Sequence, residues 1–172
     1  MQKVMILYHG TNIRFETPTI LQPNRALDFG SGFYTTTDRA QASAWAKVVI
    51  RRVNQGLPLL NIYELDEKSL LSLKVKHFER ADREWLDFVS AHRLTLYNGE
   101  NYDLIIGPLA NDNTMSVIQS YIDLSKEAQE DDRDFYAQFA LRQLRADRLK
   151  DQYVFKTETA LQHLKLLKID EL

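Results

Sequence analysis

Near the N-terminus, a histidine and a glycine stand next to each other where a short apolar run ends. Residues 4–8 form that run, and Tyr8-His9-Gly10-Thr11 closes it. A ligand can approach a glycine backbone closely because no side chain intervenes. The Gly10 N–H and C=O suit a carboxamide, and the His9 imidazole suits a ribose hydroxyl. Alone the motif is weak, since a single histidine at a strand end is more often structural.

A second motif places two aromatic residues directly after a glycine-rich turn. Gly30-Ser31-Gly32 is followed by Phe33 and Tyr34. Side chains alternate along a strand, so the two rings are predicted to face opposite sides. One ring can enter the core while the other lines a pocket, where an aromatic face can stack on a planar heterocycle. The alternative is a tight turn that feeds an ordinary strand.

A glutamine opens a late apolar segment and forms the third motif. Gln152 precedes Tyr153, Val154 and Phe155, and it would share a strand face with Val154. A side-chain amide both donates and accepts hydrogen bonds, so it can hold a ribose diol. An exposed glutamine at a strand start is the commoner interpretation.

Hydrophobic periodicity predicts the elements that would position these motifs. Short strands interrupted by helices, without regular βαβ spacing, indicate a mixed α+β domain. The predicted strands cover residues 3–9, 33–36, 59–66, 71–78, 103–106, 152–156 and 166–169. The predicted helices follow Asp38, cover 81–93, follow Asp112, cover 135–150 and follow Thr157.

Composition excludes several classes of protein. The 172 residues suit one domain over residues 1–172. Cysteine is absent, and the four histidines lack metal-ligand spacing, so we expect no disulfide and no metal. No apolar run would span a bilayer, and no secretory signal is present, which favours the cytoplasm. A net charge of −2 argues against a broad nucleic-acid footprint. Residues 142–150 are locally basic, either as a solvated helix face or as a local footprint.

In their order along the chain, the motifs resemble the ADP-ribosyltransferase superfamily, and specifically the bacterial DUF3990 group. The matching stretches are residues 7–11, 25–36, 85–89, 102–112 and 151–155. The resemblance implies a split mixed β-sheet core with flanking helices. It also implies an NAD-dependent glycosyltransferase that cleaves the nicotinamide–ribose bond of its co-substrate NAD⁺ and transfers ADP-ribose to an acceptor.

The resemblance assigns a role to each motif. His9 would bond the nicotinamide-side ribose, and the Gly10 backbone would hold the carboxamide. Tyr34 would stack on nicotinamide, and the third position of a His-Tyr-Glu triad falls on Gln152. The catalytic set is therefore His9, Tyr34 and Gln152. Further residues expected to bind NAD⁺ are Thr11, Asn12, Arg25 and Phe33, with Arg25 assigned to the diphosphate from its charge and its place in a loop.

Glutamine at the third position bears directly on catalysis. Breaking the nicotinamide–ribose bond develops positive charge on the ribose, which a glutamate offsets and a glutamine does not. Either the reaction is slow, or a carboxylate at Asp112, Asp151 or Glu158 compensates. A transferase, an NAD⁺ glycohydrolase and a non-catalytic nucleotide-binding module therefore all stay open. Relatives in this group also imply a toxin or phage-defence effector, a small antitoxin partner, and a protein or nucleic-acid acceptor.

Overall fold

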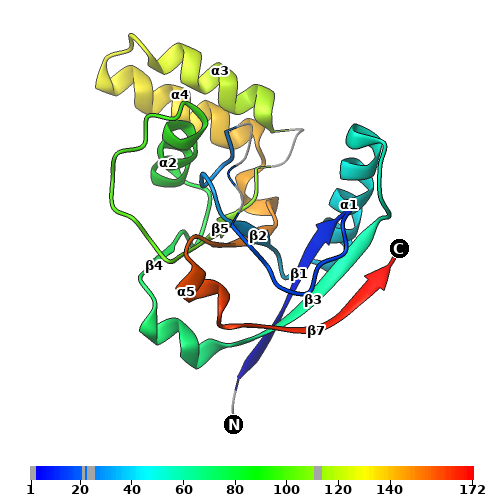
Figure 1. Cartoon of the computed structure of the whole chain (residues 1–172). Coiled ribbons are helices and arrows are strands. Elements are labelled where there is room, and N and C mark those ends of the chain that lie inside the picture. Colours follow the sequence, from blue (N-terminus) through cyan, green and yellow to red (C-terminus); the bar gives the residue numbers. More distant parts are fainter. Residues whose placement is uncertain (1–2, 21, 23–25, 111–113) are drawn as a thin grey trace.

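The computed structural model describes residues 3–20, 22, 26–110 and 114–172 of an α+β protein (Figure 1). Two β-sheets form its centre, and helices lie against both of them. The strands are β1 (Val4–Thr11), β2 (Phe33–Thr35), β3 (Leu59–Asp66), β4 (Val75–His77), β5 (Leu104–Pro108), β6 (Asp151–Phe155) and β7 (Leu164–Glu171). The helices are α1 (Arg39–Val53), α2 (Arg83–Arg93), α3 (Met115–Ser125), α4 (Glu130–Gln143) and α5 (Glu158–Leu161), with 3₁₀ turns η1 (Glu67–Ser72) and η2 (Ala146–Arg148).

The first sheet is antiparallel, with strand order β1-β3-β7. The second sheet has the order β2-β6-β5-β4 and is mixed, because β4 pairs with β5 in parallel. One isolated bridge, between Tyr8 of β1 and Thr36 just after β2, joins the two sheets among the described residues. Beyond this bridge β1 and β2 separate, so the sheets split at the end of β1 that carries His9 and Gly10.

The second sheet is buried on both faces. One face packs against α2, α3 and α4, with Val154, Trp85 and Ile118 at the centre of that contact. The other face packs against the first sheet, where Phe33, Phe155 and Tyr63 meet. Figure 1 shows α2, α3 and α4 gathered at one end of the molecule and α1 on the opposite side, beside β1 and β3.

Helix α1 is fixed by its cap and by a close approach to β1. The Asp38 carboxylate accepts a hydrogen bond from the Gln41 N–H, which satisfies one of the free donors at the helix start. The helix backbone lies so close to Gly10 that an added Cβ would overlap the Ala42 carbonyl oxygen. Glycine at position 10 therefore has a packing reason independent of any ligand.

Most predicted elements are confirmed, with corrections of extent: β7 covers Leu164–Glu171 rather than 166–169, and β1 continues to Thr11 rather than ending at His9. Residues 71–78 were expected to form one strand, but η1 continues to Ser72 and only Val75–His77 is extended. The helix expected at 135–150 begins five residues earlier, at Glu130, because the acidic residues of its first turn suit a helix N-terminus. It ends at Gln143, and Arg145 in the left-handed region breaks it. The predicted cap Asp112 lies outside the described residues.

Candidate functional site

The split between the sheets leaves one backbone edge of β1 free. Tyr8 and Thr36 exchange both backbone hydrogen bonds, at 2.8 and 3.0 Å. In an antiparallel ladder the bonded edge alternates along a strand, so Gly10 turns its N–H and C=O to the same side as Tyr8. At that point β2 has diverged, and neither Gly10 group has a hydrogen-bond partner among the described residues. A donor and an acceptor are thus left together at the split.

His9 spans this split with its side chain. Its Nδ1 lies 2.7 Å from the carbonyl oxygen of Tyr34. A carbonyl oxygen only accepts, so Nδ1 carries the hydrogen and Nε2 is left as an acceptor. Burial lowers the pKa of the imidazole below its usual value, against a smaller opposite effect of the Tyr34 bond. The neutral ring therefore offers Nε2 to an incoming hydroxyl group.

Aromatic rings hold the imidazole in place. The Phe33 ring stacks on His9 with centroids 4.2 Å apart, and the Phe15 ring meets it edge-on at 5.8 Å. Phe33 in turn packs edge-on against the buried Tyr63. The predicted NAD-binding residue Phe33 thus supports His9, and its ring belongs to the core between the two sheets.

The side chain of Tyr34 lies on the other face of β2, as strand alternation requires. Its ring packs against the core beneath α2–α4. Its hydroxyl donates to the Gly30 carbonyl at 2.6 Å and accepts from the Phe29 N–H at 3.1 Å. Burial raises the pKa of the phenol above its usual value, so the group is a neutral anchor for the 29–30 turn. His9 and Tyr34 meet through the Tyr34 backbone rather than through the ring.

Gln152 shares this second face and is almost fully buried, with 2% of its surface exposed. Its Nε2 donates to the Pro108 carbonyl at 3.1 Å and lies 3.5 Å from the Asp28 carboxylate. Its Oε1 is buried and has no hydrogen-bond partner among the described residues. The commoner expectation of an exposed glutamine is wrong here, and its amide tethers β6 to the 28–30 turn.

A buried ion pair next to Gln152 was missed by the sequence motifs. Arg93, at the end of α2, donates from Nε to Asp28 at 2.8 Å and also from Nη2, while its Nη1 reaches the Ala26 carbonyl. The second Asp28 oxygen accepts from the Ala110 N–H at 3.1 Å. Burial raises the pKa of Asp28, and Arg93 offsets that effect in part. Acidic residues in loops are too common for sequence to have marked this one.

Thr11 and Asn12, two further predicted NAD-binding residues, hold the turn that follows β1. The Thr11 hydroxyl closes a local turn with Ile13. The Asn12 side chain donates to the Gln55 carbonyl at 3.1 Å, and its own carbonyl accepts from the Leu57 N–H. Both residues border the split and are tied to the backbone around them. Arg25, the remaining predicted contact, lies outside the described residues.

Of the three candidate replacements for a catalytic glutamate, Asp112, Asp151 and Glu158, the two that the structure describes do not share one location. Asp151 accepts from the Thr37 N–H at 2.9 Å and from the hydroxyls of Thr36 and Thr37, so it fixes the turn after β2. Glu158 is exposed in the first turn of α5. Asp112 lies outside the described residues. The described part of the chain contains no cluster of three histidine or acidic side chains placed for a metal, and no helix there could cross a membrane.

The structure therefore divides the predicted site between two places. His9 and the Gly10 backbone lie at the split between the sheets, with Phe33 behind the imidazole. The Tyr34 ring and Gln152 lie on the helix-covered face of the second sheet, near Asp28. The Tyr34 carbonyl links the two places through its bond to His9.

The family described as "Protein of unknown function (DUF3990)" matches residues 5–166, so the chain belongs to it. The match runs from β1 into β7 and includes both parts of the predicted site. Neither a curated protein nor a solved structure matches the chain.

Proposed function

We propose that this member of the DUF3990 family binds NAD⁺ at the split between its sheets and acts as an ADP-ribosyltransferase. The observation that carries the proposal is the Gly10 N–H and C=O, which have no partner in the described part of the chain, beside a neutral His9 whose Nε2 is left as an acceptor. The joined but split pair of sheets agrees with the ADP-ribosyltransferase-like architecture that the sequence motifs predict.

This arrangement suits the nicotinamide end of NAD⁺. A carboxamide carries one acceptor and one donor group, which complement the Gly10 N–H and C=O. A ribose hydroxyl can donate to His9 Nε2 at the same time, because Nδ1 is already used by Tyr34. The aromatic support of Phe33 and Phe15 keeps the imidazole from rotating. Binding would therefore rely on preformed groups.

The proposed reaction breaks the bond between the nicotinamide nitrogen and the ribose. Nicotinamide leaves with the bonding electron pair, an acceptor hydroxyl or amine forms the new bond to ADP-ribose, and the acceptor proton is released. His9 orients the ribose in this scheme. Gln152 contributes through Asp28, which precedes the turn whose backbone bonds the Tyr34 hydroxyl. Stacking of the Tyr34 ring on nicotinamide would require these bonds to open. The acceptor that receives ADP-ribose, which lies outside this chain, then determines the product.

The buried position of Gln152 favours one alternative, a module that binds a nucleotide without cleaving it. Among the described residues, no charged side chain near His9 takes the place of the missing catalytic glutamate. A well-placed charged group of that kind commonly contributes about 10²–10³ in rate. If the protein binds and cleaves NAD⁺ but transfers the ADP-ribose only to water, it is a glycohydrolase.

Incubation of the full chain with NAD⁺ labelled in its adenine ring, with and without bacterial lysate, separates these functions. We expect nicotinamide release and label on macromolecules, which protease or nuclease digestion then assigns to protein or nucleic acid. Free ADP-ribose alone would indicate a glycohydrolase, and binding without release would indicate the module. His9→Asn should weaken all three signals, because loss of the Nε2 contact lowers NAD⁺ affinity about tenfold. Expression in a bacterial host should slow growth if the protein is a toxin, and His9→Asn should relieve the effect.

A further inference from the structure

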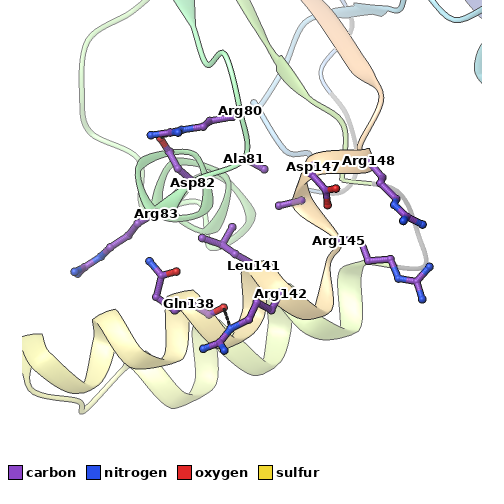
Figure 2. A pocket seen from close by; sticks show the side chains of 11 residues that line it. Arg80, Ala81, Asp82, Arg83, Gln138, Leu141, Arg142, Arg145, Asp147 and Arg148 are labelled. Atoms are coloured by element: carbon purple, nitrogen blue, oxygen red, sulfur yellow. Dashed lines mark hydrogen bonds and ion pairs between the residues drawn. The ribbon is translucent and has the colours of Figure 1, made fainter.

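An arginine-lined cleft lies between the start of α2 and the end of α4, away from the split between the sheets. Its volume is about 810 Å³. Figure 2 shows arginine side chains around its rim, with Leu141 and Ala81 toward its middle. The charged residues of its lining are Arg80, Asp82, Arg83, Arg142, Arg145, Asp147 and Arg148. Five arginines and two aspartates line this surface, although the whole chain carries a net charge of −2.

The arginines of the cleft differ in how they are held. Arg83 is fixed by Glu130 at 2.5 Å and by Asp134, so its charge is already matched. Among the described residues, the Arg142 guanidinium forms a single hydrogen bond, from Nε to the Gln138 carbonyl at 3.3 Å. Within the described residues, Arg145 and Arg148 form no ion pair. Their guanidinium groups are exposed and available to an anion.

Arg145 has an uncommon backbone conformation for a residue with a side chain. Its φ is 48°, in the left-handed region, directly after the end of α4. Helices commonly end with glycine at this position, because a side chain there is unfavourable. Arg145 therefore occupies a position where glycine would be less strained.

We propose that this cleft binds the phosphodiester backbone of single-stranded nucleic acid. Guanidinium groups pair with phosphate through two parallel hydrogen bonds and can also stack on bases, which ammonium groups do not do as well. The described lining contains arginine and no lysine. The partly exposed Leu141 side chain lies between the charged groups and suits the flat face of a base. The inference does not depend on NAD⁺ chemistry.

Fluorescence anisotropy with a labelled 20-nucleotide oligouridylate, and with DNA of matched length, tests this proposal on the full chain. We expect binding that weakens with salt, with a log–log slope of about −0.7 for each phosphate contacted. Exchanging Arg142 and Arg148 for Gln and Arg145 for Gly should weaken binding at least about tenfold. The salt slope should become less negative by about 2, since three contacts are lost. Arg51→Gln on α1 removes one charge elsewhere and should change affinity less than about twofold.

Arg145→Gly alone separates binding from folding. Glycine is preferred at a φ of 48°, so the variant should melt at the same or a higher temperature while it binds the oligonucleotide more weakly. Weaker binding with retained stability supports the proposal. The proposal would be overturned if the triple variant bound the oligonucleotide unchanged, or if polyglutamate, added as a competing polyanion, left the affinity unchanged. Tighter binding of duplex than of single strands, or no binding at low salt, would overturn it as well.

Discussion

The Nδ1 of His9 lies 2.7 Å from the carbonyl oxygen of Tyr34. A side chain of β1 thus bonds a β2 carbonyl at the point where the two strand backbones are no longer paired. This contact fixes three things at once. It assigns the hydrogen to Nδ1, it leaves Nε2 as an acceptor, and it satisfies a carbonyl at the edge of the split. The structural role of His9 and its proposed ligand-binding role thus reside on different atoms of one ring.

Two substitutions at His9 should separate these roles. Asparagine can place its side-chain N–H near the position of Nδ1 and still donate to Tyr34, but it has no group at Nε2. We expect His9→Asn to lower NAD⁺ affinity about tenfold, the value of one hydrogen bond. His9→Ala should weaken binding equally and also lower the free energy of unfolding by a further ~1 kcal/mol, because the Tyr34 carbonyl loses its donor. Calorimetry and urea unfolding measure the two effects.

Equal stability of the two variants would show that the Tyr34 contact contributes little. Unchanged NAD⁺ affinity in His9→Asn would remove Nε2 from the proposed site. Because the proposed carboxamide contacts come from the Gly10 backbone, some binding should persist in both variants at high ligand concentration.

Replacing Gln152 by glutamate should not create a better enzyme. The Gln152 amide lies 3.5 Å from the Asp28 carboxylate and is buried, so a second carboxylate there would repel the first. Its folded-state pKa would rise above the unfolded value of about 4.3. Stability is then retained at pH values below about 4 and is lost as the pH rises through the folded pKa. At pH 7 we expect unfolding to be easier by ~3 kcal/mol or more, measured by urea titration at pH 4 and pH 7.

A charge exchange provides the control for this prediction. Asp28→Asn together with Gln152→Glu restores one carboxylate and one amide, so the double variant should be more stable at pH 7 than Gln152→Glu alone. If both variants were equally unstable, shape rather than charge repulsion would explain the result. Little loss of stability in Gln152→Glu at pH 7 would contradict the buried contact itself.

Sequence patterns predicted the parts of the site that depend on local order. Alternation along β2 correctly placed Phe33 and Tyr34 on opposite faces, and it placed Gln152 on the same face as Val154. Periodicity also located α1, and the Asp38 cap marked its first residue. Each of these features depends on neighbours within a few residues, which a single sequence shows directly.

Contacts between distant residues could not be predicted in this way. Arg93 pairs with Asp28 across 65 positions of the chain, and Gln152 reaches Asp28 across 124. Nothing in either local pattern marks one arginine or one aspartate among many. The free edge of Gly10 was equally hidden, since it depends on where β2 leaves β1 rather than on the glycine itself.

The loss of folding stability should be much larger for Arg93→Met than for Arg83→Met. Arg93→Met leaves the Asp28 carboxylate, 4% exposed, without its cation. Loss of one partner from a buried pair costs ~3–5 kcal/mol. Arg83 joins α2 to α4 through Glu130 and Asp134 at the surface, where ion pairs contribute about 1 kcal/mol or less. Urea unfolding of both variants checks this, and similar losses would show that the Asp28 pair is not the stronger anchor.

Lys156 should react with small electrophiles at a lower pH than the exposed lysines. Its Nζ donates to the Phe29 carbonyl and lies near His92, and burial lowers the pKa of its amine to about 8. At pH 7.5 about a quarter of this amine is unprotonated, against about one in a thousand for an ordinary lysine. Carbamylation by cyanate, followed by mass spectrometry across pH 6–11, gives a rate profile for each lysine. We expect the Lys156 profile to level off above pH 8, with the exposed Lys68 as the reference. A Lys156 rate that keeps rising to pH 10 would mean that its amine is solvated like the others, and the packing around the Gly30 turn would need revision.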